Sequence, residues 1–165
     1  MKPFAATFLV LFLGAMRFLN AQESSIDPNR FQLEVTDGAE ASTTVNNDGP
    51  NGQPAVTAVV AKTGLEFWSV ELRAPDVNLE PGKTYEIKFQ AKSVPSRYIY
   101  VVPEKMNGNQ ASVAEGTILQ LSDQWTGCTV VFNTTEPANP GRLTISSLSA
   151  KPASFWFSNV RVTQK

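Results

Sequence analysis

The sequence predicts an all-β fold, a two-sheet antiparallel β-sandwich. Short runs of alternating apolar and polar residues recur roughly every ten residues, with turn-forming residues between them. No segment after residue 21 keeps a helical period. Many short strands separated by Gly- and Pro-rich turns are typical of sandwiches, so this fold class is favoured over a helical one.

The clearest predicted strand is 85–92, YEIKFQAK, and the other elements are organised around it. Its apolar residues occupy every second position, which predicts one buried and one polar face. The preceding Pro81-Gly82 predicts a turn, because Pro presets φ and Gly accepts a positive φ. The upstream strands are predicted at 31–36, 41–45 (a weaker one), 55–61 and 67–73, with a loop by composition at 46–54.

Five further strands are predicted downstream, at 97–102, 117–121, 125–133, 142–148 and 154–163. The long polar segment 103–116 lies between the first two of them. A loop of that length in a compact domain is usually functional or disordered.

The last strand contains a break in its alternation. Phe155 and Phe157 are in one phase, whereas Val160 and Val162 are in the other. A bulge at Ser158-Asn159 is predicted, because one extra residue would point both pairs into the core.

The N-terminal residues predict a secretory signal peptide over 1–21. Lys2 precedes an apolar run, 4–13, that is too short to span a membrane, and cleavage is expected after Ala21. Residues 22–30 are a polar lead-in, and 31–165 form a single β-sandwich domain. We therefore expect a secreted protein, either extracellular or periplasmic.

Charge and cysteine content restrict the partners. Removal of the signal peptide takes away Lys2 and Arg17 and leaves a net charge of −3. This argues against nucleic acid or an anionic membrane as the main partner, and we expect a monomer. Cys128 is the only cysteine, so no internal disulfide can form, and its place in an apolar alternation predicts a buried, inert thiol.

Several motifs, taken in order, resemble a known family. They are Trp68-Ser69-Val70-Glu71, the turn Leu79-Glu80-Pro81-Gly82-Lys83-Thr84-Tyr85, Trp125 before a strand ending in Val131-Phe132, and Phe155-Trp156-Phe157-Ser158-Asn159-Val160. Together the chain resembles the jelly-roll carbohydrate-binding modules of the xylan- and β-glucan-binding group, over about residues 31–162. The turn and its strand are the most specific part.

The resemblance implies a concave sheet face that holds one glycan chain by aromatic stacking and polar contacts. Many members of this family also hold a structural calcium ion, through an early acid and an aspartate in the last strand. Gln32 and Ser158 stand at those positions here, so calcium is possible but doubtful and no cofactor is required. The segment 103–116 has no aromatic residue, so a second stacking ring is not expected there.

The alternation of two consecutive strands suggests where a sugar would bind. Sugar rings offer apolar C–H faces rimmed by hydroxyl groups, so a binder needs aromatic rings beside polar groups. Tyr98 and Tyr100 point away from the core, as do Lys88 and Gln90. Because a short turn joins the two strands, we predict that the tyrosines lie beside Lys88 and Gln90. The alternative is that the tyrosines only fill a solvated sheet face.

The positions of the three tryptophans follow less directly from strand alternation. Alternation puts Trp68 in the core and Glu71 on the outward face, whereas the resemblance implies that Trp68 is a stacking ring at the cleft edge and Glu71 a hydroxyl acceptor. Both positions of Trp68 stay open. Trp125 is expected to cap the core, and Trp156 to be a surface platform or to pack under a loop.

These residues predict a non-catalytic polysaccharide-binding module for xylan or β-glucan, rather than an enzyme. The chain has no histidine, which removes Ser-His-Asp and Cys-His catalysis and histidine-ligated zinc. Glu66 and Glu71 do not complete the Glu-x-Asp-x-x-Glu pattern of sandwich glycosidases, because Trp68 stands in the middle. The alternative function is a secreted protein-binding or adhesive β-sandwich with no sugar ligand.

Overall fold

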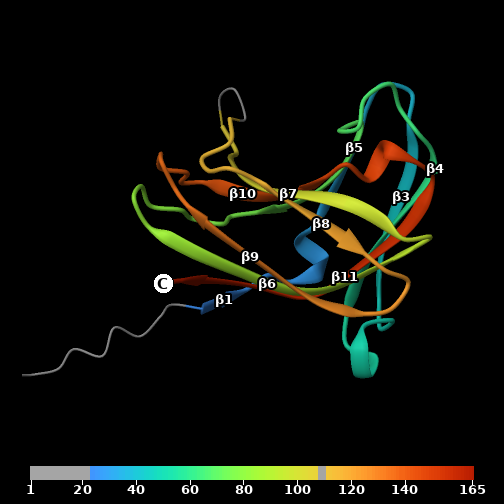
Figure 1. Ribbon diagram of the computed structural model, residues 1–165, viewed down its shortest axis with the longest axis horizontal. Helices are drawn as coiled ribbons and strands as arrows, with labels where there is room; N and C mark the ends of the chain where they lie inside the picture. The colour runs from blue at the N-terminus through green and yellow to red at the C-terminus, as the bar shows by residue number, and fades with distance from the viewer. Residues whose placement is uncertain (1–22, 108–110) are drawn as a thin grey trace, which may run out of the picture.

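The alternating strands form two antiparallel sheets that lie against each other as two layers (Figure 1). Their apolar sides face each other and form one core. The computed structural model describes residues 23–107 and 111–165. The six-strand sheet has the order β3 (Glu40–Asn46), β4 (Ala55–Lys62), β11 (Ala153–Gln164), β6 (Thr84–Val94) and β9 (Thr126–Asn133), with β1 (Glu23–Ser25) paired to β11. The five-strand sheet has the order β2 (Gln32–Val35), β5 (Val70–Pro75), β10 (Gly141–Ser146), β7 (Arg97–Lys105) and β8 (Thr117–Leu121). The predicted all-β sandwich of jelly-roll type is confirmed.

Short 3₁₀ turns, Pro28–Arg30, Pro50–Gly52 and Leu148–Ala150, complete the secondary structure described. The described residues contain no helix long and apolar enough to cross a membrane. The predicted signal peptide, 1–21, lies outside the described residues.

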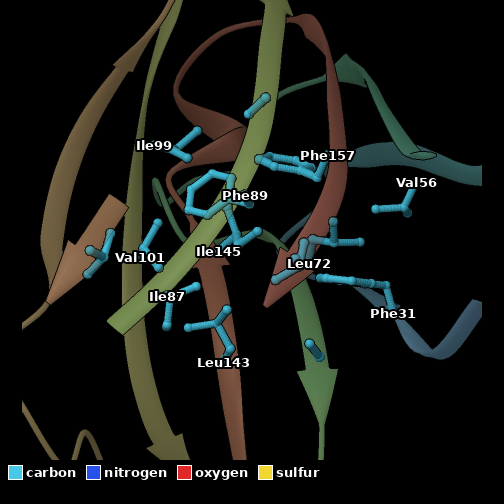
Figure 2. Packing of buried hydrophobic residues seen from close by; sticks show 14 of the residues in the cluster. Phe31, Val56, Leu72, Ile87, Phe89, Ile99, Val101, Leu143, Ile145 and Phe157 are labelled. Atoms are coloured by element: carbon cyan, nitrogen blue, oxygen red, sulfur yellow. The ribbon is translucent and has the colours of Figure 1, made fainter. Parts of the chain in front are cut away.

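The core lies between the sheets and is built from every second residue of the central strands. Figure 2 shows Leu72, Ile99, Val101, Leu143 and Ile145 of the five-strand sheet against side chains of the other sheet. Those partners include Val56, Ile87, Phe89 and Phe157. Each of these side chains is almost fully buried, and burying a side chain of this size stabilises the fold by about 1.5–3 kcal/mol.

The predicted bulge in the last strand is confirmed. The pairing of β11 with β6 shifts register between Ser158 and Arg161, and Asn159 adopts the left-handed conformation with φ 54°. Phe155, Phe157, Val160 and Val162 are consequently all buried. The extra residue turns the strand so that both apolar pairs face the core.

Several boundaries differ from the prediction. The strand expected at 97–102 continues to Lys105, so the loop expected at 103–116 begins later, and the strand expected at 142–148 ends at Ser146. Residues 23–25, expected in a lead-in, form β1 because they pair with the C-terminal half of β11. The strand expected at 67–73 begins only at Val70, since residues 65–68 form a turn closed by the hydrogen bond from Ser69 N–H to Glu66 O, 3.1 Å.

Candidate functional site

The outer face of the five-strand sheet presents a continuous row of side chains. The register places Glu34 opposite Glu71, Ser146 opposite Tyr100, and Tyr100 opposite Ile118. The Ser146 hydroxyl hydrogen-bonds the Glu71 carboxylate and so joins the two halves of the row. The row runs across all five strands because successive residues of each strand alternate between the core and this face.

Ion pairs fill the middle of this face. The Arg73 guanidinium donates from Nη2 to Glu71 Oε2 at 2.6 Å and also pairs with Glu34. The Arg142 guanidinium donates from Nε to Glu104 Oε2 at 2.9 Å, and the Thr144 hydroxyl donates to the same oxygen at 2.6 Å. Both arginine side chains are largely buried, so each positive charge is balanced inside the face rather than offered to solvent.

Glu71 is the most perturbed acid in this network. It is 9% exposed, and this burial raises the pKa of its carboxyl above the ordinary value. The hydrogen bond from Ser146 and the charge of Arg142 lower the pKa of Glu71, whereas the nearby charge of Glu104 raises it further. Arg73 pairs with both Glu34 and Glu71, and this shared ion pair does not cancel the rise in the pKa of Glu71 that burial causes. A buried carboxylate with a raised pKa on the outer face of a sheet is a candidate for a functional site.

An apolar hollow of about 670 Å³ adjoins this polar network. It is lined by Phe67, Tyr98, Ile99, Tyr100, Ile118 and Ser147. Tyr98 is 59% exposed and Ile118 68% exposed, so their apolar surfaces are open to a ligand. Gly116 packs directly on the Tyr100 ring, and a Cβ at this glycine would lie 2.6 Å from Tyr100 Cε2 and closer still to Cζ. The hollow therefore offers one open tyrosine, Tyr98, and one held in place by the backbone of Gly116.

A second, smaller hollow of about 200 Å³ lies on the β2–β5–β10 side of the same sheet. Gln32, Glu34, Arg73, Pro75 and Arg142 line it, together with Met106 from the segment after β7. Because four of these side chains are polar, this hollow can supply hydrogen bonds, whereas the first supplies apolar contact.

Trp68 lies outside the core, at the end of the face near β5. It is 47% exposed and contacts Phe67 edge-to-face, with the ring centroids 4.5 Å apart. Ser69 fixes this turn, because its buried hydroxyl donates to Asp37 Oδ2 at 3.0 Å and its carbonyl accepts from Thr36 N–H at 2.8 Å. Alternation placed Trp68 in the core because it assumed a strand that began too early.

The predicted contact of Lys88 and Gln90 with the tyrosines is wrong. Lys88 and Gln90 lie on β6, which pairs with β9 and β11, whereas Tyr98 and Tyr100 lie on β7 in the other sheet. The link between β6 and β7 carries the chain from one sheet to the other instead of closing a hairpin. The two pairs therefore share no face.

Trp125 does not cap the core either. Its ring lies 5.3 Å from Lys92 Nζ, and Lys92 is on the outer face of the six-strand sheet. Trp156 lies on the same face and is half-buried, as its outward phase predicts. Cys128 packs against the edge of the core, and burial raises the pKa of its thiol.

The residues at the two positions implied for calcium do not fit that ion. Gln32 is on β2, whereas the Ser158 hydroxyl, on β11 of the other sheet, donates to Pro54 O at 2.7 Å. Within residues 23–107 and 111–165 no group of three or more acidic, cysteine or histidine side chains could hold a metal ion.

Comparison with known proteins places this chain in a family. The model of a carbohydrate-binding domain family, CBM_4_9, matches residues 30–152. The chain belongs to this carbohydrate-binding domain family. No curated protein matches it.

Solved structures share the fold. A structure described as "CBM4 structure and function" has a TM-score of 0.68 and 19% identity, over 84% of this chain and 89% of its own. The N-terminal cellulose-binding domain of Cellulomonas fimi β-1,4-glucanase C has a TM-score of 0.63 and 15% identity, over 85% and 91%. The CBM22-1 xylan-binding domain of Paenibacillus barcinonensis Xyn10C has a TM-score of 0.58 and 16% identity, over 86% and 92%.

Of the predicted site residues, Glu71, Tyr98 and Tyr100 share the outer face of the five-strand sheet, and Trp68 lies at its end. The prediction from sequence did not include Phe67, Ile118 or the residues that contact Glu71. Ile118 could have been found, because alternation with Leu119 and Leu121 points it outward. Phe67 carried no such signal, since it lies in a turn.

Proposed function

We propose that the outer face of the five-strand sheet binds a single β-glycan chain of xylan or β-glucan type without catalysis. The observation that carries the proposal is an apolar hollow, lined by Phe67, Tyr98 and Tyr100, on the same face as the buried Glu71 carboxylate. Ser146 lies between them, opposite Tyr100 and hydrogen-bonded to Glu71. A sugar needs both elements, an apolar surface for its C–H face and acceptors for its hydroxyl groups.

In this proposal Tyr98 is the main stacking ring, and Tyr100 supplies a fixed second surface. Glu71 accepts a hydrogen bond from a sugar hydroxyl, while the polar hollow beside Arg73 takes the neighbouring sugar. Trp68 extends the aromatic surface beyond Phe67. The family match supports a polysaccharide partner, and the names of the similar structures, a cellulose-binding and a xylan-binding domain, favour β-linked glycans.

The alternative is a protein-binding sandwich. The apolar exposure of Leu65, 86%, and Ile118, 68%, favours it, because such side chains also suit a protein interface. Complete burial of Trp68, Tyr98 and Tyr100 would have removed the stacking groups and favoured this alternative further. Tyr98 and Trp68 are exposed and Tyr100 is half-buried, so the rings that sugar binding needs are present.

Affinity electrophoresis and calorimetry against soluble xylan, mixed-linked β-glucan, laminarin and mannan test the proposal. We expect xylan or a β-glucan to retard the protein, and Glu71→Ala and Tyr98→Ala each to weaken binding by about 1–3 kcal/mol. Lys88→Ala and Gln90→Ala are matched controls on the opposite sheet and should leave the affinity for neutral glycans unchanged. The absence of retardation by every glycan, with the protein folded, would refute the proposal.

The remaining proposals rest on the sequence alone. We propose that the protein is secreted, acts as a monomer and needs no cofactor for binding. A monomeric mass in sedimentation at binding concentrations and binding unchanged by a chelator are the expected results.

A further inference from the structure

The outer face of the six-strand sheet places two cations directly opposite each other. The register pairs Arg161 of β11 with Lys88 of β6. Like charges opposite each other on antiparallel strands repel, so this pairing is unfavourable unless an anion lies near both. Arg161 Nη1 lies 3.0 Å from the exposed carboxylate of Glu23. Lys88 Nζ lies 2.9 Å from the largely covered carboxylate of Glu86, which Lys165 also binds, at 2.8 Å. The Arg161–Glu23 pair is exposed, and such pairs contribute only about 0–1 kcal/mol, so another carboxylate can replace Glu23. Glu86 is shared between Lys88 and Lys165, so its single negative charge does not balance both cations.

An open hollow of about 430 Å³ lies between these cations. Lys88, Gln90, Gly127, Thr129, Asn159 and Arg161 line it, whereas Glu23 and Glu86 do not. Gly127 is opposite Gln90 and has no atom within 4 Å of its Cβ position, so this point of the sheet is left uncovered. Asn159 Nδ2 donates to Gln90 Oε1 at 2.8 Å, which orients the Gln90 amide.

Two indole rings continue this face beyond the hollow. Lys92 Nζ lies 4.6 Å from the Trp156 ring centroid and 5.3 Å from that of Trp125. The rings hold the ammonium group in place, and within the described residues Lys92 forms no ion pair. Lys88 and Lys92 are four residues apart on one strand, so their Cα atoms lie about 13 Å apart along the face. That length suits several sugar units rather than a small ion.

The two outer faces therefore differ in charge. On the five-strand face, Arg73 and Arg142 are largely buried in carboxylate pairs. On the six-strand face, the side chains of Lys88 and Arg161 are more than half exposed, although the whole chain has a net charge of −1. Of these four cations, the two on the six-strand face are open to a ligand.

We propose that the outer face of the six-strand sheet is a second glycan-binding site, for a polysaccharide that carries carboxylate groups. Lys88 and Arg161 bind one carboxylate across the hollow, Lys92 binds another, and the amides of Gln90 and Asn159 contact hydroxyl groups. The indole rings of Trp125 and Trp156 contact the apolar sugar faces at the far end. The proposal concerns a different surface from the β-glycan site and does not depend on it.

Affinity electrophoresis with polygalacturonate tests this proposal, and fully methyl-esterified polygalacturonate is the matched neutral probe. We expect retardation by the acid form alone and its loss at high salt, because exposed charges are screened within about 10 Å at 0.1 M salt. Lys88→Gln combined with Arg161→Gln should raise the Kd roughly tenfold or more, since two charge-assisted contacts are removed. Gly127→Leu, which fills the hollow without changing charge, should weaken binding as well.

The control variant combines Lys62→Gln with Lys105→Gln. It removes the same charge from two lysines outside the hollow, one exposed and one partly exposed, and should leave the Kd within about twofold. Equal weakening by both double variants would overturn the proposal in favour of unspecific charge attraction. Binding to phosphatidylserine vesicles with no binding to polygalacturonate would overturn it in favour of a lipid surface.

These assays test the two proposed glycan sites independently. Tyr98→Ala should leave polygalacturonate retardation intact, and the Lys88 and Arg161 variant should leave xylan or β-glucan retardation intact. Loss of acid-polysaccharide binding on Tyr98→Ala would show that both ligands use the five-strand face, and would overturn the second site alone.

Discussion

Substitution of Gly116 by alanine tests the geometry of the aromatic hollow. A Cβ at this position would lie 2.6 Å from Cε2 of Tyr100, and real Cβ atoms do not approach other atoms so closely. The backbone of Gly116 is not in the left-handed region, so the strain falls on the Tyr100 ring rather than on φ. The Tyr100 ring must therefore move from its present position beside Tyr98 to make room for the Cβ atom.

The size of the effect follows from overpacking. The crowded atoms belong to the distal end of the half-buried Tyr100 side chain, so the ring can turn aside. The substitution should therefore cost about 1 kcal/mol, the low end for overpacking, which corresponds to a Tm lower by about 2–4 °C for a domain of this size. If Tyr100 contacts the glycan, its displacement should also weaken binding, by about 1–2 kcal/mol. Thermal unfolding and affinity electrophoresis measure the two effects on the same sample.

Two further variants isolate the contact with Tyr100. Gly127→Ala is the matched control, since this glycine has no atom within 4 Å of its Cβ position, and it should lower neither stability nor neutral-glycan affinity. In a Tyr100→Ala background the Gly116→Ala change should cost little, because the clash is gone. An equal loss of stability in both backgrounds would refute the packing of Gly116 on Tyr100.

Three other predictions concern the same face and its metal content. Glu71→Gln should gain stability relative to wild type as pH rises from 4 to 7 in denaturant titrations. Because the pKa of Glu71 is raised in the folded protein, the protonated carboxyl stabilises the fold below the ordinary pKa of 4.5, and this stabilisation of wild type is lost as the pH rises. A difference in unfolding free energy between variant and wild type that does not change with pH would contradict the burial of this charge. Trp68→Ala should lower the unfolding free energy by less than about 1 kcal/mol, because the ring lies outside the core; a loss above about 3 kcal/mol would place it inside. A calcium chelator should leave the Tm unchanged, and a fall would reveal a bound ion.

The sandwich could be predicted because its signals are local. Alternation in 85–92 and the phase break at Ser158-Asn159 each specify which face of a strand is buried, and the structure has both. Local patterns do not specify which sheet a strand joins. Lys88 and Tyr98 are both outward residues on consecutive strands, yet the link between β6 and β7 crosses the sandwich and puts them on opposite surfaces.

The candidate site could be predicted only in part for the same reason. Glu71 and the tyrosines follow from strand phase, whereas Trp68 and Phe67 depend on a turn fixed by the Ser69–Asp37 hydrogen bond. Asp37 is distant from Ser69 in sequence, so no local pattern indicates that contact. The misplaced residues Lys88 and Gln90 nevertheless lie together on a second surface with its own aromatic rings.

The central claim is that neutral β-glycan binds the outer face of the five-strand sheet, and an NMR titration tests it most directly. ¹⁵N-labelled protein would be titrated with xylohexaose and with a mixed-linked β-glucan tetrasaccharide. We predict that the amide shifts concentrate on β5, β7 and β10, with the largest changes near Glu71 and Tyr98. Shifts confined to β6, β9 and β11 for these neutral ligands would contradict the claim and move the binding site to the opposite face.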